Sequence, residues 1–301
     1  MDERAADELT GLLSMWKLGE LAWRELLRRT WCQFWENRIL DQSAKLSFYF
    51  LLSIFPLLLF LIALLGLLLQ SGPVLQETLH KYLAAVVPES APGLIDTTLQ
   101  EITQGAGGGK LSLALLFALW AASKGMVAII EALNIAYEVE ESRPWWKKHL
   151  VALGLTIVSV VLIVSALLLM TYGGRLSDIL VSSFGFGSFI AKAWQVLQWP
   201  LLLGFVLMAF NILYLYAPNV KHRRWHWLMP GTIVGVVLWL MASFGFKLYL
   251  SLFDRFTVTY GSIGAVITLL LWLYLSGTAI LIGGEVNSEI EKASLEKPQG
   301  R

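Results

Sequence analysis

Six long apolar runs dominate the pattern of hydrophobic and polar positions along the chain. The runs are continuous, without the alternation of a half-buried strand, and each reaches the length of about 18 residues that a helix needs to cross hydrocarbon. Because backbone polar groups cannot stay unpaired in lipid, we expect each run to form a transmembrane helix. The predicted helices cover roughly residues 46–69, 111–135, 149–172, 194–216, 228–251 and 261–283. The pattern therefore predicts an all-α, polytopic membrane protein.

Basic residues are distributed unevenly among the segments that separate these runs. Seven Lys and Arg residues precede the first run, and three more lie in each of the second connection, the fourth connection and the C-terminal tail. The remaining connections carry five in all. By the positive-inside rule, we expect both termini to lie in the cytoplasm. Composition supports a membrane protein, because only 15% of the residues are charged, against about 25% in soluble domains.

The residues before the first run, 1–41, form a segment that we interpret as cytoplasmic, amphipathic and interfacial. Large apolar residues recur near one helical face, at Trp16, Trp23, Leu27, Trp31 and Phe34. With basic residues beside them, this face is typical of a helix that lies on the cytoplasmic leaflet. The alternative is an ordinary helix that packs on the rest of the protein.

Residues 42–288 form the predicted six-helix transmembrane domain, and residues 289–301 a cytoplasmic tail. The external connection 71–110 shows helical apolar spacing on both sides of a Pro/Gly turn, so we expect a short helical hairpin there. Its sequence GAGGGK lacks the first glycine and the Ser or Thr of a phosphate-binding loop. We expect no signal peptide, because the first run is too long for one and starts late. The single cysteine, Cys32, excludes an intramolecular disulfide.

Charged residues inside the second run raise the main functional question. Lys124 lies near the middle of the run, where a lysine costs about 2.5–3.5 kcal/mol on insertion scales. Glu131 follows on the same helical face, about 10 Å further along the axis. Side chains lean toward the start of a helix, so Glu131 leans toward Lys124 while Lys124 leans away. We therefore expect each of them to find its partner on another helix or in water.

Small residues share this face, which indicates close packing against neighbouring helices. Several further polar residues lie at the same predicted depth, in the cytoplasmic half of the bundle. Our hypothesis is a polar cavity open to the cytoplasm, whose substrate-binding residues are Lys124, Glu131, Asn134, Asn211, Glu285 and Asn287. The alternative is a set of packing hydrogen bonds with one buried ion pair.

Basic residues in the cytoplasmic connections lie beside tryptophans, as at a membrane interface. We expect them to contact anionic lipid headgroups through Arg143, Lys147, Lys148, Arg223 and Arg224. His222 and His226 have a spacing that can bind a metal, but no third ligand accompanies them. The chain also lacks a G-x-S-x-G motif and a credible Cys/His nucleophile pair. We expect no metal, no cofactor, no catalytic residue and no enzymatic activity.

Several stretches resemble the YihY/virulence factor BrkB family of bacterial inner-membrane proteins. The stretches are AKLSFYFLLSIFPLLL, LWAASKGMVAIIEALNIAYEVEESRPWWKK, YLYAPNVKHRRWHWLMPG and YGSIGAVITLLLWLYLSGTAILIGGEVNSEIE, within about residues 30–292. The resemblance assigns family motif positions to Lys124, Asn134, Arg143, Pro144, Glu285 and Asn287. Lys45 departs from the family pattern, where a small apolar residue is expected, and is therefore a weaker site candidate.

The resemblance implies a six-helix protein of the bacterial inner membrane. Members of the family carry a ribonuclease label or have been linked to serum resistance or envelope lipid export. The residues here give no support for a ribonuclease, because metal-dependent hydrolysis needs clustered His and Asp ligands.

The first functional interpretation is transport or handling of a lipid or an amphiphilic anion through the polar cavity. The alternative is a non-catalytic scaffold of the cell envelope. We expect membrane lipids and not nucleic acid as partners, and the sequence leaves open a homo-oligomer or an envelope complex.

Overall fold

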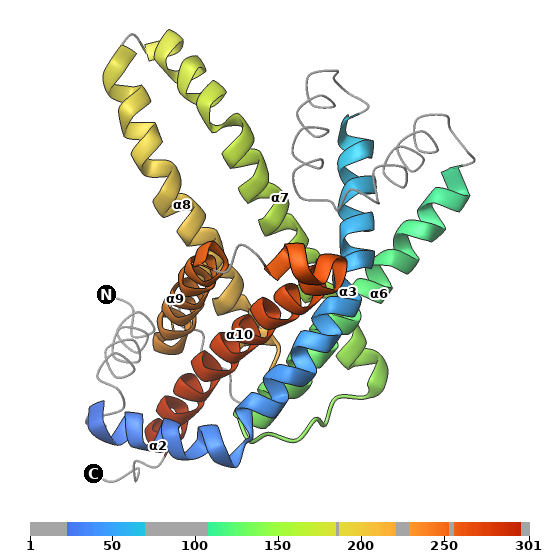
Figure 1. Ribbon diagram of the computed structural model, residues 1–301, viewed down its shortest axis with the longest axis vertical. Coiled ribbons are helices and arrows are strands. Elements are labelled where there is room, and N and C mark those ends of the chain that lie inside the picture. The colour runs from blue at the N-terminus through green and yellow to red at the C-terminus, as the bar shows by residue number, and fades with distance from the viewer. Residues whose placement is uncertain (1–22, 70–107, 185–186, 221–228, 253–255, 296–301) are drawn as a thin grey trace, which may run out of the picture. The chain divides into compact units, whose positions relative to one another are not determined.

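The computed structural model describes residues 23–69, 108–184, 187–220, 229–252 and 256–295 (Figure 1). Within these ranges the chain is helical and contains no strand. The helices are α2 (Trp23–Glu36), α3 (Ile39–Leu69), α6 (Gly108–Ala136), α7 (Trp145–Phe184), α8 (Gly187–Tyr216), α9 (Pro230–Leu252) and α10 (Phe256–Leu295). The prediction of an all-α protein is confirmed.

Six helices of the described chain are long and apolar enough to cross a membrane. The candidate spans are Ile39–Leu61, Leu115–Ala136, Trp145–Met170, Val196–Tyr216, Pro230–Ser251 and Gly264–Ser294. The predicted number of transmembrane helices is therefore confirmed. The first span begins earlier than its apolar run and the last ends later, because polar residues such as Ser43 and Glu285 are buried at those ends.

The chain divides into two compact units. The large unit consists of Met1–Tyr49 and Met126–Arg301, and the small unit is Phe50–Gly125. In the small unit, Gly125 of α6 lies against α3, since a Cβ atom placed there would be 2.8 Å from the Ser53 hydroxyl oxygen. A glycine at this position therefore lets the two helices approach closely.

Close packing of α9 on α10 forms much of the interior of the large unit. A Cβ atom at Gly235 of α9 would lie 2.6 Å from the Tyr214 hydroxyl oxygen, and one at Gly283 of α10 would lie 3.0 Å from the Gly235 Cα. The buried Tyr214 hydroxyl donates a hydrogen bond to the Ile280 carbonyl, at 2.8 Å. Small residues on both helices thus allow backbone contact, as expected for helices that pack within a bilayer. Helices α7 and α8 also run side by side (Figure 1).

Helix α2 crosses the end of α10 and has two distinct faces (Figure 1). Leu26 is 3% exposed and packs with Val286 and Ile290 of α10. The opposite face leaves four large side chains more than half exposed, namely Trp23, Leu27, Trp31 and Trp35. One face thus packs on the protein, as in the alternative interpretation, and the other has the composition of a membrane-interface surface.

A left-handed turn separates α2 from α3. Arg38 has a φ of 50°, and its amide donates a hydrogen bond to the Trp35 carbonyl at 3.2 Å. A residue in this conformation ends a helix, because it turns the chain away from the helical path. The turn lets α2 and α3 leave the same point in different directions.

Several predictions fall outside the described residues. These predictions concern residues 1–22 of the 1–41 segment, the external connection up to residue 107, and the tail after residue 295. They also concern the connection that contains His222, Arg223, Arg224 and His226.

Candidate functional site

Four segments meet at one end of the large unit, which we call the polar end. They are helix α2, the connection 137–144 after α6, the connection 217–220 after α8, and the last turns of α10. Lys292 of α10 pairs with Glu138 at 2.7 Å, and the Arg143 guanidinium donates to the Ala217 carbonyl at 2.8 Å. The positive-inside argument assigned these same segments to one side of the membrane. The direction in which this end faces stays a prediction.

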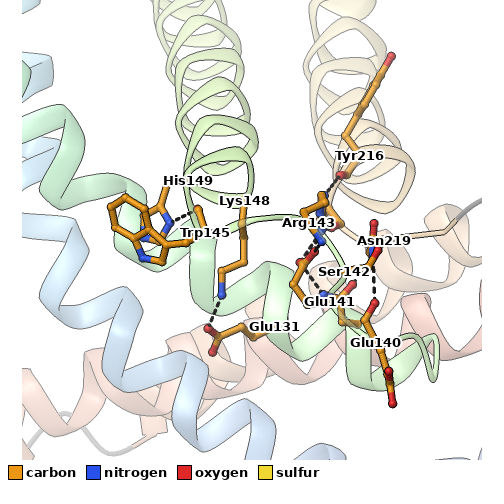
Figure 2. A network of polar contacts seen from close by, with 12 residues as sticks. Glu131, Glu140, Glu141, Ser142, Arg143, Trp145, Lys148, His149, Tyr216 and Asn219 are labelled. Atoms are coloured by element: carbon orange, nitrogen blue, oxygen red, sulfur yellow. Dashed lines mark hydrogen bonds and ion pairs between the residues drawn. The ribbon is translucent and has the colours of Figure 1, made fainter.

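Glu131 joins three helices at the polar end. Its carboxylate pairs with the Lys45 ammonium of α3 at 2.9 Å. It also pairs with the Lys148 ammonium of α7 at 3.0 Å (Figure 2). Lys148, expected at lipid headgroups, is thus engaged within the protein, with 17% of its side chain exposed. Lys45 had been ranked as a weak candidate because it departs from the family pattern. Its partner was identifiable from charge alone, since both residues were placed at similar depth.

Arg143 lies at the centre of a group that we call the connection network: Asn134, Glu141, Arg143 and Asn219. Its Nε and Nη2 atoms donate to the two oxygens of Glu141, both at 2.8 Å. Figure 2 shows the guanidinium between the connection after α6 and the end of α8. With 10% of its side chain exposed, Arg143 fixes one connection to the other. Contact of Arg143 with lipid headgroups stays a prediction.

Asn134 extends the connection network into the interior. It is 5% exposed, donates to Glu141 at 3.0 Å and accepts a hydrogen bond from the Asn219 amide at 2.8 Å. Burial opposes ionisation of Glu141, but hydrogen bonds from Arg143 and Asn134 outweigh it, so the pKa of this carboxyl lies below its ordinary value. Glu141 is therefore a stable anion, and the network is fully engaged in holding the two connections.

The other two candidate asparagines serve the start of α9. The Asn287 side-chain oxygen accepts a hydrogen bond from the Gly231 amide at 2.8 Å. Asn211 accepts from the Met229 amide at 3.3 Å and from the Thr232 hydroxyl at 3.2 Å. Amides at the start of a helix have no partner within it, so both side chains satisfy groups that would otherwise be unpaired.

Glu285 differs from these asparagines because its carboxyl is only half engaged. The residue has no exposed surface, and one oxygen accepts a hydrogen bond from the Asn37 side chain at 2.8 Å. The other oxygen is buried without a hydrogen-bond partner among the residues that the structure describes. An unpaired buried oxygen is costly when the group is ionised.

Lys124 belongs to the small unit, whereas the other five candidate substrate-binding residues belong to the large unit. Its ammonium lies 4.3 Å from the centroid of the Trp120 ring, one turn earlier on α6. This is cation–π geometry, and it agrees with the expectation that Lys124 leans toward the start of its helix. Lys147, the remaining headgroup candidate of the described chain, is exposed.

A cavity of about 360 Å³ opens at the polar end between α2 and α10. We call it the α2–α10 cavity, and its lining consists of Arg28, Arg29, Cys32, Gln33, Glu138, Glu289 and Lys292. None of the candidate residues from the sequence lines it. Its lining comes from three segments that are far apart in the sequence, so helical periodicity within any one of them did not indicate the cavity. The sequence indicated this cavity only through the charged residues near Cys32 and in the tail.

The family model described as virulence factor BrkB matches residues 30–301. The chain belongs to the virulence factor BrkB family. This BrkB-family chain is 36% identical, over 252 residues, to the putative ribonuclease-like protein YfkH of Bacillus subtilis, covering 84% of the chain and 90% of that protein. No solved structure matches it.

Two UPF0761 membrane proteins are further relatives of the BrkB-family chain. The one from Photobacterium profundum is 27% identical, covering 84% of the chain and 77% of that protein. The one from Tolumonas auensis is also 27% identical, covering 89% and 85%. Together with the six apolar helices of this chain, these relatives establish a multi-pass protein of the bacterial inner membrane. In the described ranges, no three His, Cys, Asp or Glu side chains are grouped so that they could hold a metal ion.

Proposed function

We propose that this BrkB-family protein handles an amphiphilic lipid or organic anion and moves it across the inner membrane, without catalysis. The observation that carries the proposal is the α2–α10 cavity, which lies beneath a helix whose outer face is aromatic and exposed. Tryptophans on such a face favour the headgroup level of a bilayer. A charged cavity beside that face is accessible to the polar part of a membrane amphiphile.

Lys124 supplies the second element of the proposal. An ammonium within a transmembrane helix is expensive unless it faces polar groups, water or a ligand. Its position above the Trp120 ring leaves the cation close to an aromatic surface. We assign to Lys124 the attraction of an anionic group at membrane depth, and to the α2–α10 cavity the collection of the molecule at the membrane surface.

The alternative, a scaffold of the cell envelope, is favoured by a different observation. Asn134, Asn211 and Asn287 all hold backbone amides or connections in place. These three residues support packing, so the predicted substrate role is weakest for them.

Reconstitution into liposomes distinguishes the two functions. If the protein moves amphiphiles, full-length protein will carry fluorescent phospholipids or an organic anion across the bilayer, and Lys124→Met will slow the movement at least about tenfold. The matched variant Lys247→Met removes an exposed lysine from α9 and should leave the rate unchanged. Absence of movement above protein-free liposomes, for lipids and anions alike, favours the scaffold.

A further inference from the structure

The charges that line the α2–α10 cavity are separated by sign. Arg28 and Arg29 come from α2, on one wall. Glu138 and Glu289 form the other wall together with Lys292, whose ammonium lies 2.7 Å and 3.0 Å from the two carboxylates. The cavity is therefore not a uniformly basic site.

The formal charge on each wall follows from the residues that line the cavity. Glu25, which does not line the cavity, accepts hydrogen bonds from Arg28 at 2.8 Å and from Arg29 at 3.1 Å. Among the lining residues, the α2 wall carries the two guanidinium charges of Arg28 and Arg29. Two carboxylates with one ammonium leave the facing wall with one net negative charge. A ligand that carries both signs matches this arrangement, whereas a simple anion meets the acidic wall without compensation.

We propose that the α2–α10 cavity binds the zwitterionic headgroup of a membrane phospholipid that carries a primary ammonium and a phosphodiester. The phosphodiester lies at Arg28 and Arg29, since planar guanidiniums suit phosphate oxygens. The ammonium lies at Glu138, whose side chain is 41% exposed. The inference rests on the proposed function in taking a membrane amphiphile as the ligand, and it adds the chemical class of the headgroup.

Size and location support a lipid as the source of this headgroup. About 360 Å³ falls within the range of small-molecule sites, which is about 300–1,000 Å³. The same helix presents Trp23, Leu27, Trp31 and Trp35 on its outer face, where acyl chains and headgroups meet. A lipid of the adjacent leaflet thus reaches the cavity with its acyl chains still in the membrane.

Cys32 provides a direct test, because it lines the cavity, is exposed and is the single cysteine of the chain. Full-length protein is placed in nanodiscs of phosphatidylcholine, with or without phosphatidylethanolamine, and the rate of alkylation by a water-soluble maleimide is measured. We expect phosphatidylethanolamine to slow alkylation, by about tenfold when nine-tenths of the sites are occupied. Phosphatidylglycerol, an anion without an ammonium, should slow it much less.

Variants on both walls complete the test. Arg28→Gln and Glu138→Gln should each abolish the protection by phosphatidylethanolamine. Arg24→Gln removes an exposed charge of α2 outside the cavity and should retain it. Equal protection by phosphatidylglycerol, or protection that survives both wall variants, overturns the proposal. Equal protection by water-soluble glycerophosphoethanolamine at the same total concentration assigns the site to a free solute and also overturns it.

Binding and movement are measured separately, so the two proposals fail separately. Protection of Cys32 without lipid movement in liposomes contradicts transport but not the headgroup site. Movement without protection contradicts the headgroup site alone.

Discussion

The connection network and the α2–α10 cavity lie at the same end of the large unit, yet their charges are arranged differently. In the network, the Arg143 guanidinium contacts Glu141 and a backbone carbonyl, and 10% of its side chain is exposed. In the cavity, charges of both signs surround about 360 Å³ of space, and Lys292 and Glu138 keep 29% and 41% of their side chains exposed. Polar residues near a membrane therefore differ in role according to whether they face protein or open space.

The largest expected effect comes from breaking the connection network at its centre. Arg143→Leu leaves Glu141 charged and half-enclosed, so the free energy of unfolding should fall by about 3 kcal/mol. Thermal unfolding in detergent measures the change. Lys147→Leu, at an exposed position four residues after Arg143, should change it by less than about 0.5 kcal/mol. Equal effects of the two substitutions would show that Arg143 has no structural role.

A smaller loss is expected when the interior member of the network is removed. Asn134→Ala deletes the hydrogen bonds to Glu141 and to the Asn219 amide, which should cost about 1–2 kcal/mol. The same unfolding measurement applies. Ser142→Ala removes one exposed acceptor of the Asn219 side chain and serves as the control. A loss no greater than that of the control contradicts the packing role of Asn134.

The connection network should also respond to acid. The pKa of Glu141 lies below its ordinary value of 4.5, so its contribution to stability is fully present above pH 4.5 and is lost as the pH falls through the lower, folded-state pKa. Unfolding midpoints measured from neutral pH downward should therefore fall more steeply for the wild type than for Glu141→Gln. Parallel curves for the two proteins would exclude this contribution.

The smallest effect on stability is expected in the cavity. Glu138→Gln loses an ion pair whose partners are both partly exposed, which is worth less than about 1 kcal/mol. Protection of Cys32 by phosphatidylethanolamine should nevertheless disappear, because the acidic wall loses its net charge. A Glu138→Gln protein that is strongly destabilised would place this residue with the connection network and remove the contrast between the two regions.

Sequence patterns predicted the transmembrane helices because apolar side chains favour lipid over water, and each continuous apolar run is long enough to cross the hydrocarbon layer. They were less informative about helix ends. Helix α10 continues past its apolar run to Leu295, since Glu285, Asn287 and Glu289 are buried against other helices. Burial of that kind depends on partners that are distant in the sequence.

Site predictions from the sequence identified polar residues but not their partners. Glu131 was expected to find a partner on another helix, and it pairs with Lys45 and Lys148. Arg143 was expected at lipid headgroups because it lies in a basic, aromatic connection, but it pairs with Glu141, two residues earlier in the same connection. The cavity was missed because α2 and α10 approach each other only in the fold.

Native mass spectrometry of lipids retained by the purified protein tests the central claim most directly. We predict that wild-type protein, extracted from membranes of mixed phospholipids, retains a phosphatidylethanolamine molecule in preference to phosphatidylglycerol. Glu138→Gln should lose this preference, while Arg24→Gln should keep it. Retention of the two lipids in proportion to their abundance, with no change in Glu138→Gln, would contradict a zwitterionic headgroup site in the α2–α10 cavity.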